Sequence, residues 1–244
     1  MPADPLENIP DLRAPEDVVS WLAHEAGRLV SLRFDGRDDR EVFSLAPGDD
    51  ALGAGALGPG RDERFVLAML LADWACYADP AHREEYAHLR QTFSVYPKGF
   101  RLWLGRVGET CVPVGYTAFH PIARETYLAM RERPESLISR KQIRPEPESP
   151  RGAAHLYLYN LCILGPFQAT PASRRLVKTL AADMAATGAR ALAAVAVSPA
   201  GRRVVERFGM RSSGFMTHDG HREMVYVSEE APNGEASGEA GEHA

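Results

Sequence analysis

The chain has 244 residues, of which 45% are hydrophobic and 25% are charged. This composition is typical of a globular protein with a sizeable core, so disorder throughout the chain is excluded. The net charge of −5 arises from five glutamates in residues 229–244, because the rest of the chain holds equal numbers of basic and acidic residues. A neutral body argues against a nucleic-acid surface, which needs clustered positive charge.

The chain carries no sign of a membrane or secretory protein. Its longest apolar run, Phe65 to Ala72, ends at Asp73 and is too short to span a bilayer, and its first residues are acidic and proline-rich, unlike a signal peptide. Three widely spaced cysteines, Cys76, Cys111 and Cys162, form neither a disulfide framework nor a zinc site by themselves. We therefore expect a cytoplasmic protein with reduced thiols, and neither a membrane nor a nucleic acid as partner.

Three segments are rich in glycine, proline or charge and lack the periodicity of regular structure: residues 46–60, 131–151 and 229–244. The first two are predicted to be flexible loops, and the third a disordered acidic tail. Residues 1–40 are expected to form an N-terminal helical extension, because Pro15 to Ala26 has apolar residues at helical spacing. The main domain is then predicted to cover residues 41–228.

Within this domain, the chain begins with a strand near Glu41 and two helices, Glu63–Tyr77 and Pro80–Phe93. Alternating residues then predict a hairpin of Phe100–Val107 and Val112–Phe119. After the proline-rich loop, residues 154–164 are aromatic and apolar on both faces, which is typical of a central strand covered on both sides.

The last third of the chain alternates helices and strands. Helices are expected from Pro171 to Gly188 and from Pro199 to Gly209, and strands over Ala191–Val197, Ser213–Thr217 and Glu223–Val227. Thr170 and Ser198 precede the two helical prolines and are suited to cap the helices. The order of elements predicts an α/β protein, with helices on both faces of a mixed sheet.

This order, from about Glu41 to Ser228, resembles that of the GCN5-related N-acetyltransferase (GNAT) superfamily. The resemblance rests on the stretches RLWLGRV…VPVGYTAF, LYLYNLCILGPFQATPASRRLVKTLA and VAVSPAGRRVVERFGM. It implies a GNAT-like acyltransferase fold, acetyl-CoA or another acyl-CoA as co-substrate, no metal, and acyl transfer by direct attack of an amine. The implied acceptor is a small-molecule or protein amine, and a homodimer is left open.

In that family, a loop of pattern Q/R-x-x-G-x-G/A at a helix start holds the pyrophosphate of acyl-CoA. Aligned without a gap, the loop falls on residues 168–173, where Gln168 fits and Pro171 and Ser173 replace the glycines. The implied binding residues are Leu161, Cys162 and Ile163 for the pantetheine and Gln168, Ala169, Thr170, Ala172, Ser173 and Arg174 for the pyrophosphate.

The usual catalytic residues of the family are replaced. No carboxylate lies on the central strand, where Tyr157 and Tyr159 share one face, and Val205 stands where a tyrosine protonates the thiolate of CoA. The catalytic candidates are therefore Tyr157, Tyr159 and His120, which would order a water that deprotonates the amine unless the amine is already neutral, with His120 also suited to act as a base. Ser198 or water would protonate the thiolate.

Simpler interpretations stay open for several of these residues. The tyrosines can pack beneath a helix, and His120 can be an ordinary histidine at a strand end. The sequence HDGH at residues 218–221 offers three potential metal ligands, but Asp-Gly at its centre favours a hairpin turn. Because the strand glutamate, helix tyrosine and loop glycines are all replaced, a non-catalytic GNAT-like module that binds a ligand or protein is the alternative function.

Overall fold

The computed structural model describes residues 9, 15–32, 42–47, 49, 61–107, 110–147, 152–218 and 220–230. Among them, seven strands form one sheet: β1 (Val42–Leu45), β2 (Phe100–Val107), β3 (Thr110–Pro121), β4 (His155–Ile163), β5 (Ala191–Ala196), β6 (Arg211–His218) and β7 (His221–Val227). The helices are α1 (Pro15–Ser31), α2 (Arg61–Cys76), α3 (Tyr86–Val95), α4 (Arg124–Glu132), α5 (Pro171–Ala185) and α6 (Pro199–Arg207). Most of the predicted loop at 46–60 and of the predicted tail at 229–244 lies outside the described residues.

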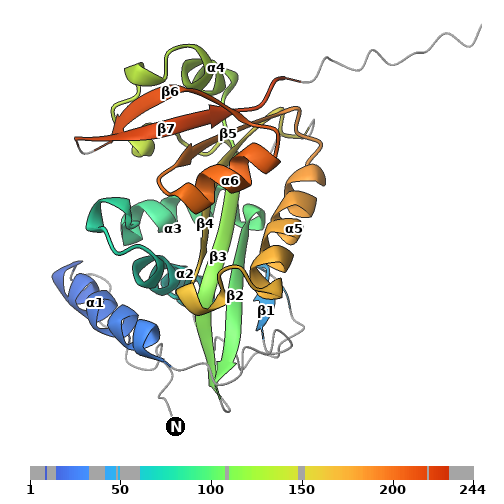
Figure 1. Cartoon of the computed structure of the whole chain (residues 1–244). Coiled ribbons are helices and arrows are strands. Elements are labelled where there is room, and N and C mark those ends of the chain that lie inside the picture. The colour runs from blue at the N-terminus through green and yellow to red at the C-terminus, as the bar shows by residue number, and fades with distance from the viewer. Residues whose placement is uncertain are drawn as a thin grey trace, which may run out of the picture.

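The sheet is mixed, as the sequence predicts. Its strand order is β1-β2-β3-β4-β5-β7-β6 (Figure 1). Only β4 and β5 are parallel within it, and the other neighbours are antiparallel. Because parallel strands need a crossover, α5 joins β4 to β5 across one face of the sheet.

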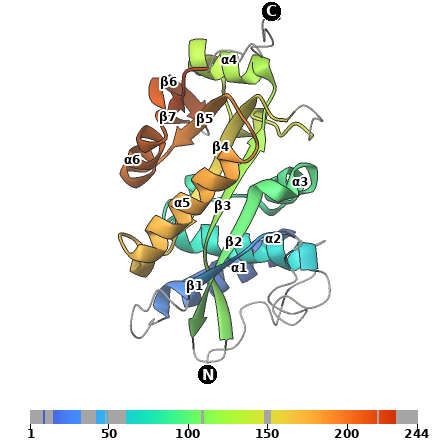
Figure 2. The ribbon, with the colours of Figure 1, turned by 90° about the vertical axis from the view of Figure 1, so that its right-hand side faces the viewer.

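Helices cover both faces. Figures 1 and 2 show α5 on one side of the sheet and α2 with α1 on the other. Leu180 of α5 and Val205 of α6 belong to one buried cluster with Leu158 of β4 and Ala196 of β5. Since successive residues of a strand face opposite sides, the large aromatic and apolar content of β4 reflects its burial on both faces.

Helix α2 explains the longest apolar run of the sequence. Residues Phe65–Ala72 are all buried, because α1 packs on one side of α2 and the sheet on the other. A helix that is apolar all round is typical of such a fully enclosed position. Among the described residues, none of the helices combines the length and hydropathy needed to cross a membrane.

The predicted loop at 131–151 holds regular structure in its described part, residues 131–147. Helix α4 ends at Glu132, before Pro134, and two 3-10 turns follow, Pro134–Ser136 and Arg140–Gln142. Leu137 and Ile143 are buried, and the Thr217 N–H of β6 donates to the Leu137 carbonyl at 3.2 Å. The prolines prevent a long helix or strand here, but they do not prevent packing against the sheet.

The prediction of one helix over Pro80–Phe93 is wrong in its first half. Pro80–His82 forms a 3-10 turn, and α3 begins only at Tyr86. The Glu84 N–H donates to the buried carboxylate of Asp73 at 2.7 Å, which holds this segment out of helical conformation. The connection between α2 and α3 therefore has a fixed shape beside the sheet.

Candidate functional site

Strands β4 and β5 separate along their length. They pair only from His155 and Ala191 to Leu158 and Ala194. Beyond Leu158, the edge of β4 that faces β5 has no strand partner among the described residues. Backbone N–H and C=O groups on this edge therefore lack a strand partner and can bond to an extended ligand, although the Ile163 carbonyl already accepts from Gln168 Nε2.

A β-bulge marks the start of this separation. Ala118 of β3 pairs with Asn160 and Phe119 pairs with Leu158, so Tyr159 is the extra residue on β4. A bulge bends a strand and redirects its side chains. As a result, the consecutive side chains of Tyr159 and Asn160 both reach the segment formed by α2 and α3.

The space between the separated strands is a narrow cavity of about 50 Å³, which we call the donor cleft. Its walls come from β4, β5, α6, the link between β5 and α6, and two residues from more distant parts of the chain, Tyr77 and Arg140. The full lining is Tyr77, Arg140, Tyr157, Leu158, Tyr159, Asn160, Leu161, Ala194, Val195, Ala196, Val197, Ser198, Gly201, Val204 and Val205.

Behind the donor cleft lies a buried carboxyl group, that of Asp73. Its Oδ1 accepts hydrogen bonds from Tyr116 Oη at 3.1 Å and from Asn160 Nδ2 at 2.8 Å. Burial raises the pKa of Asp73 to about 7, and the charge of Glu84 adds to this effect. Asp73 thus fixes Asn160 in the cleft wall and titrates near neutral pH.

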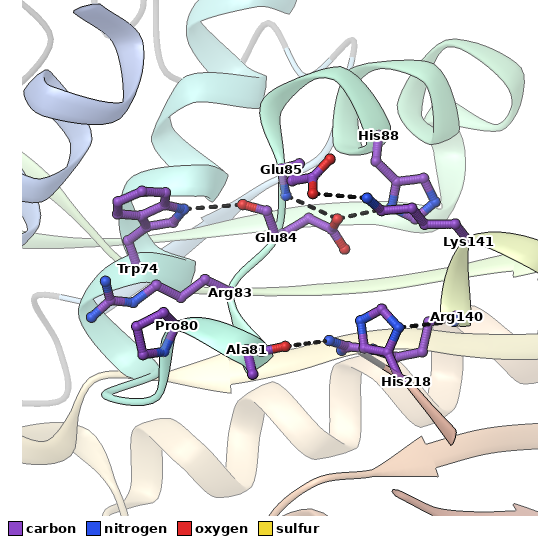
Figure 3. A pocket seen from close by; sticks show the side chains of 10 residues that line it. All are labelled: Trp74, Pro80, Ala81, Arg83, Glu84, Glu85, His88, Arg140, Lys141 and His218. Carbon is purple, nitrogen blue, oxygen red and sulfur yellow. Dashed lines mark hydrogen bonds and ion pairs between the residues drawn. The ribbon is translucent and has the colours of Figure 1, made fainter. Parts of the chain in front are cut away.

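A second cavity of about 200 Å³ adjoins the cleft (Figure 3), and we call it the acceptor cavity. It lies between the connection of α2 to α3 and the 3-10 turn at Arg140, and its lining is mostly ionisable: Trp74, Pro80, Ala81, Arg83, Glu84, Glu85, His88, Arg140, Lys141 and His218.

Glu84 and His88 form a hydrogen-bonded pair in this cavity (Figure 3). Burial on its own raises the pKa of Glu84, but hydrogen bonds from His88, Tyr159 and the Glu85 N–H outweigh it, so this pKa lies below its usual range. An ionised carboxylate only accepts hydrogen bonds, so Nδ1 of His88 carries a proton and Nε2 keeps its lone pair in the neutral ring. Nδ1 also lies 3.3 Å from Tyr159 Oη, which joins the pair to the donor cleft.

The structure brings together the three residues predicted to assist deprotonation of an amine, because the His120 ring centroid lies 5.4 Å from that of Tyr157 and 5.7 Å from that of Tyr159. Tyr157 and Tyr159 line the donor cleft with ring centroids 6.4 Å apart. Burial raises the pKa of both well above the usual value, so both hydroxyls stay protonated near neutral pH.

His120 packs against the two tyrosine rings but does not line the donor cleft. It is fully buried in β3 opposite Tyr157, and its Nδ1 is 3.0 Å from the Pro121 carbonyl. Burial lowers its pKa to about 4, which makes it a weak base. The sequence places His120 at the exit of a strand near the cleft mouth, but β3 continues through Pro121, and His120 lines neither cavity.

Ser198 and Val205 lie in the wall of the donor cleft, as expected for the start of α6. Ser198 Oγ accepts from the Gly201 N–H at 3.0 Å and caps the helix. Its hydroxyl hydrogen remains available as a donor. Val205 offers no proton at the position of the family's tyrosine.

Helix α5 begins at Pro171, so the predicted pyrophosphate loop does precede a helix N-terminus. Ala169 has a positive φ of 60°, and the side chain of Arg174 is exposed. The predicted hydroxyl donors are already engaged, however, because Thr170 Oγ1 donates to the Phe167 carbonyl and Ser173 Oγ to the Thr170 carbonyl. Local bonding of this kind is common for Ser and Thr.

Of the remaining predicted binding residues, only some face the donor cleft. Leu161 lines it, whereas the side chains of Cys162 and Ile163 are buried in the core, and so is Ala172. Gln168 Nε2 donates to the Ile163 carbonyl at 3.1 Å. Contacts from Cys162, Ile163 and Ala172 would therefore be made by their backbone.

The sequence did not single out Asp73, Glu84, His88 or Arg140. Two signals were present: Asp73 interrupts an apolar run, and Glu84 and His88 have the i, i+4 spacing of side chains that meet on a helix. Arg140 gave no such signal, since it lies in a segment rich in charge.

No family model and no curated protein matches this chain. Solved structures match it at low sequence identity. The NatC complex bound to Gag peptide and CoA is 10% identical, with 78% of this chain and 99% of the other covered and a TM-score of 0.51. The GphF GNAT-like decarboxylase in complex with isobutyryl-CoA is 16% identical, with 68% and 95% covered and a TM-score of 0.48. Arabidopsis thaliana Naa50 with a bisubstrate analogue is 10% identical, with 78% and 99% covered and a TM-score of 0.46.

The architecture defines an α/β protein with a mixed sheet that opens between two parallel central strands. This is the GNAT fold, and the low identities make the chain a divergent example of it. The fold predicted from the sequence is therefore confirmed.

Proposed function

We propose that the chain is an acyl-CoA-dependent N-acyltransferase. The observation that carries the proposal is the unpaired edge of β4 beyond Leu158, which borders the donor cleft. A pantetheine arm alternates amide donors and acceptors, and it would bond to this edge as an added strand does. The match to NatC, whose structure contains CoA, agrees with this use of the fold.

The pyrophosphate of the donor would lie at the start of α5. The first-turn N–H groups of a helix have no intrahelical partner, and the helix dipole favours an anion there. Ser173 lies in this turn, and the exposed Arg174 follows it. The altered loop would thus bind the pyrophosphate through backbone N–H groups and the Arg174 cation, although it lacks the glycines of the family pattern.

His88 would act as the general base. An acceptor amine in the acceptor cavity would give its proton to Nε2 of His88, and Glu84 would stabilise the imidazolium that forms. The amine nitrogen would then attack the thioester carbonyl carbon, forming a C–N bond. Collapse of the tetrahedral intermediate would break the C–S bond, and the new amide nitrogen would lose its remaining extra proton. Ser198 would relay that proton to the CoA thiolate and keep its own hydroxyl hydrogen.

Calorimetric titration with acetyl-CoA and with CoA tests the donor site, and acetyl transfer to a panel of small amines and peptides tests the reaction. We expect binding of acetyl-CoA and transfer to at least one class of amine. Binding without transfer to any acceptor would favour the alternative of a non-catalytic module. If neither acetyl-CoA nor CoA binds, the proposal fails.

A further inference from the structure

Arg140 lies where the donor cleft and the acceptor cavity meet. Among the described residues, Arg140 is the one that lines both cavities. It begins the 3-10 turn Arg140–Gln142, which a reciprocal pair of hydrogen bonds between Ser139 and Gln142 fixes. The side chain is mostly buried, with 21% of its surface exposed, so a cation is held in a confined space.

One edge of the Arg140 guanidinium group contacts other residues of the protein. Its Nε is 3.4 Å from Oε2 of Glu223, and its Nη2 donates to the Ala81 carbonyl at 3.1 Å. Among the described residues, the third nitrogen, Nη1, has no hydrogen-bond partner. A guanidinium has five N–H donors in a plane, so it can bind a second carboxylate while it keeps Glu223.

Tyr157 supplies a second donor in the same cleft wall. Only 3% of this residue is exposed, yet it lines the donor cleft, and its hydroxyl has no hydrogen-bond partner in the described part of the chain. Most polar groups in confined places are paired, so an unused hydroxyl at the wall of a cavity points to a ligand.

We propose that Arg140 Nη1 and the Tyr157 hydroxyl form a carboxylate-binding site for the acyl group, so that the chain prefers acyl-CoAs whose acyl chain ends in a carboxylate. This inference rests on the proposed function, because it assumes that the thioester lies in the donor cleft. A neutral acyl chain would leave both donors without a partner in a confined space, which is unfavourable. A terminal carboxylate would satisfy both of them at the point where donor and acceptor meet.

Malonyl-CoA and isovaleryl-CoA provide a matched test, since a carboxylate and an isopropyl group have similar shapes but different charge. We expect the wild-type protein to bind malonyl-CoA roughly 10- to 100-fold more tightly than isovaleryl-CoA in calorimetry, the effect of hydrogen bonds to a charged group. Acetyl-CoA, titrated in parallel, reports on the donor site without any terminal group.

Three variants locate the effect. Arg140→Gln should reduce the preference to less than about threefold, and Tyr157→Phe should reduce it partly. Because Arg140→Gln also alters the neighbour of the buried Glu223 and can destabilise the fold, Tyr157→Phe, which removes one oxygen atom, is the second test. Lys141→Gln is the control: this cation pairs with Glu85 and lines only the acceptor cavity, so the preference should stay.

The outcomes separate the two proposals. Equal affinity of the wild type for all three acyl-CoAs overturns the carboxylate site and leaves the proposed function standing. A preference for malonyl-CoA that persists in both Arg140→Gln and Tyr157→Phe also overturns it. Failure of every acyl-CoA to bind overturns the proposed function, and the carboxylate site with it.

Discussion

Nδ1 of His88 lies 2.8 Å from Oε1 of Glu84, at the wall of a cavity that adjoins the opening between β4 and β5. The pair places the proposed base on α3, whereas the sequence directs attention to the tyrosines of β4. A carboxylate that holds an imidazole in one tautomer is a common arrangement for a general base.

The His88 base is testable by substitution. His88→Gln should lower kcat for acetyl transfer by roughly 100-fold, while the affinity for acetyl-CoA stays within about twofold, because His88 lines only the acceptor cavity. His221→Gln, at an exposed position of β7, serves as the control and should change neither quantity. If His88→Gln keeps the full kcat on an acceptor that the wild type uses, His88 is not the base.

Asp73 should make folding stability depend on pH. Its pKa is raised from 3.8 to about 7 in the folded state, so the folded protein binds this proton more tightly than the unfolded chain. Stability from this group is therefore fully present below pH 3.8 and is lost as pH rises through about 7, by up to roughly 4 kcal/mol. Asp73→Asn abolishes this titration.

The measurement is thermal unfolding of wild type and Asp73→Asn at several pH values from 4 to 8. We expect the Tm of the wild type to fall relative to that of the variant as pH rises. Asp62→Asn, which changes an exposed carboxylate of the same helix, should show the same pH dependence of Tm as the wild type. A constant difference in Tm between wild type and Asp73→Asn would show that Asp73 keeps an ordinary pKa.

The proposed pyrophosphate site at the start of α5 can be tested by adding a negative charge there. Ser173→Glu places a carboxylate in the first turn, where it would compete with and repel a bound pyrophosphate, and should weaken acetyl-CoA binding by at least roughly tenfold. Ala182→Glu adds the same charge at an exposed position nearer the other end of the helix and should leave affinity almost unchanged. If the two variants bind acetyl-CoA with equal affinity, the start of this helix is not the pyrophosphate site.

The last described residues should contribute unequally to stability. The Glu230 carboxylate lies 3.3 Å from both His155 Nε2 and Arg190 Nη2 and is 22% exposed, whereas the ion pair of Glu229 with Arg211 is almost fully exposed. Glu230→Gln should lower Tm by about 2 °C, as expected for a loss of about 1 kcal/mol, and Glu229→Gln should not change it. Identical Tm values for the two variants would show that Glu230 is not anchored, and that the predicted tail begins at residue 229.

The sequence by itself determined most of the elements and their order, with α4 and the start of α3 as the exceptions. Strand β2 has the predicted limits, Phe100–Val107, and α5 and α6 begin at the predicted prolines, Pro171 and Pro199. These features depend on spacings of two to four residues and on a Ser or Thr followed by Pro, so they are encoded locally. The order of elements was then enough to indicate the GNAT fold.

Tertiary structure alone decided the chemistry of the candidate site. Tyr159 meets His88 across 71 residues, and Asn160 meets Asp73 across 87. The raised pKa of Asp73, the burial of His120 and the place of Arg140 between two cavities arise only when strands and loops distant in the chain enclose one another. The spacing of residues along the sequence does not predict such burial, because the desolvation of a side chain depends on what the whole fold places around it.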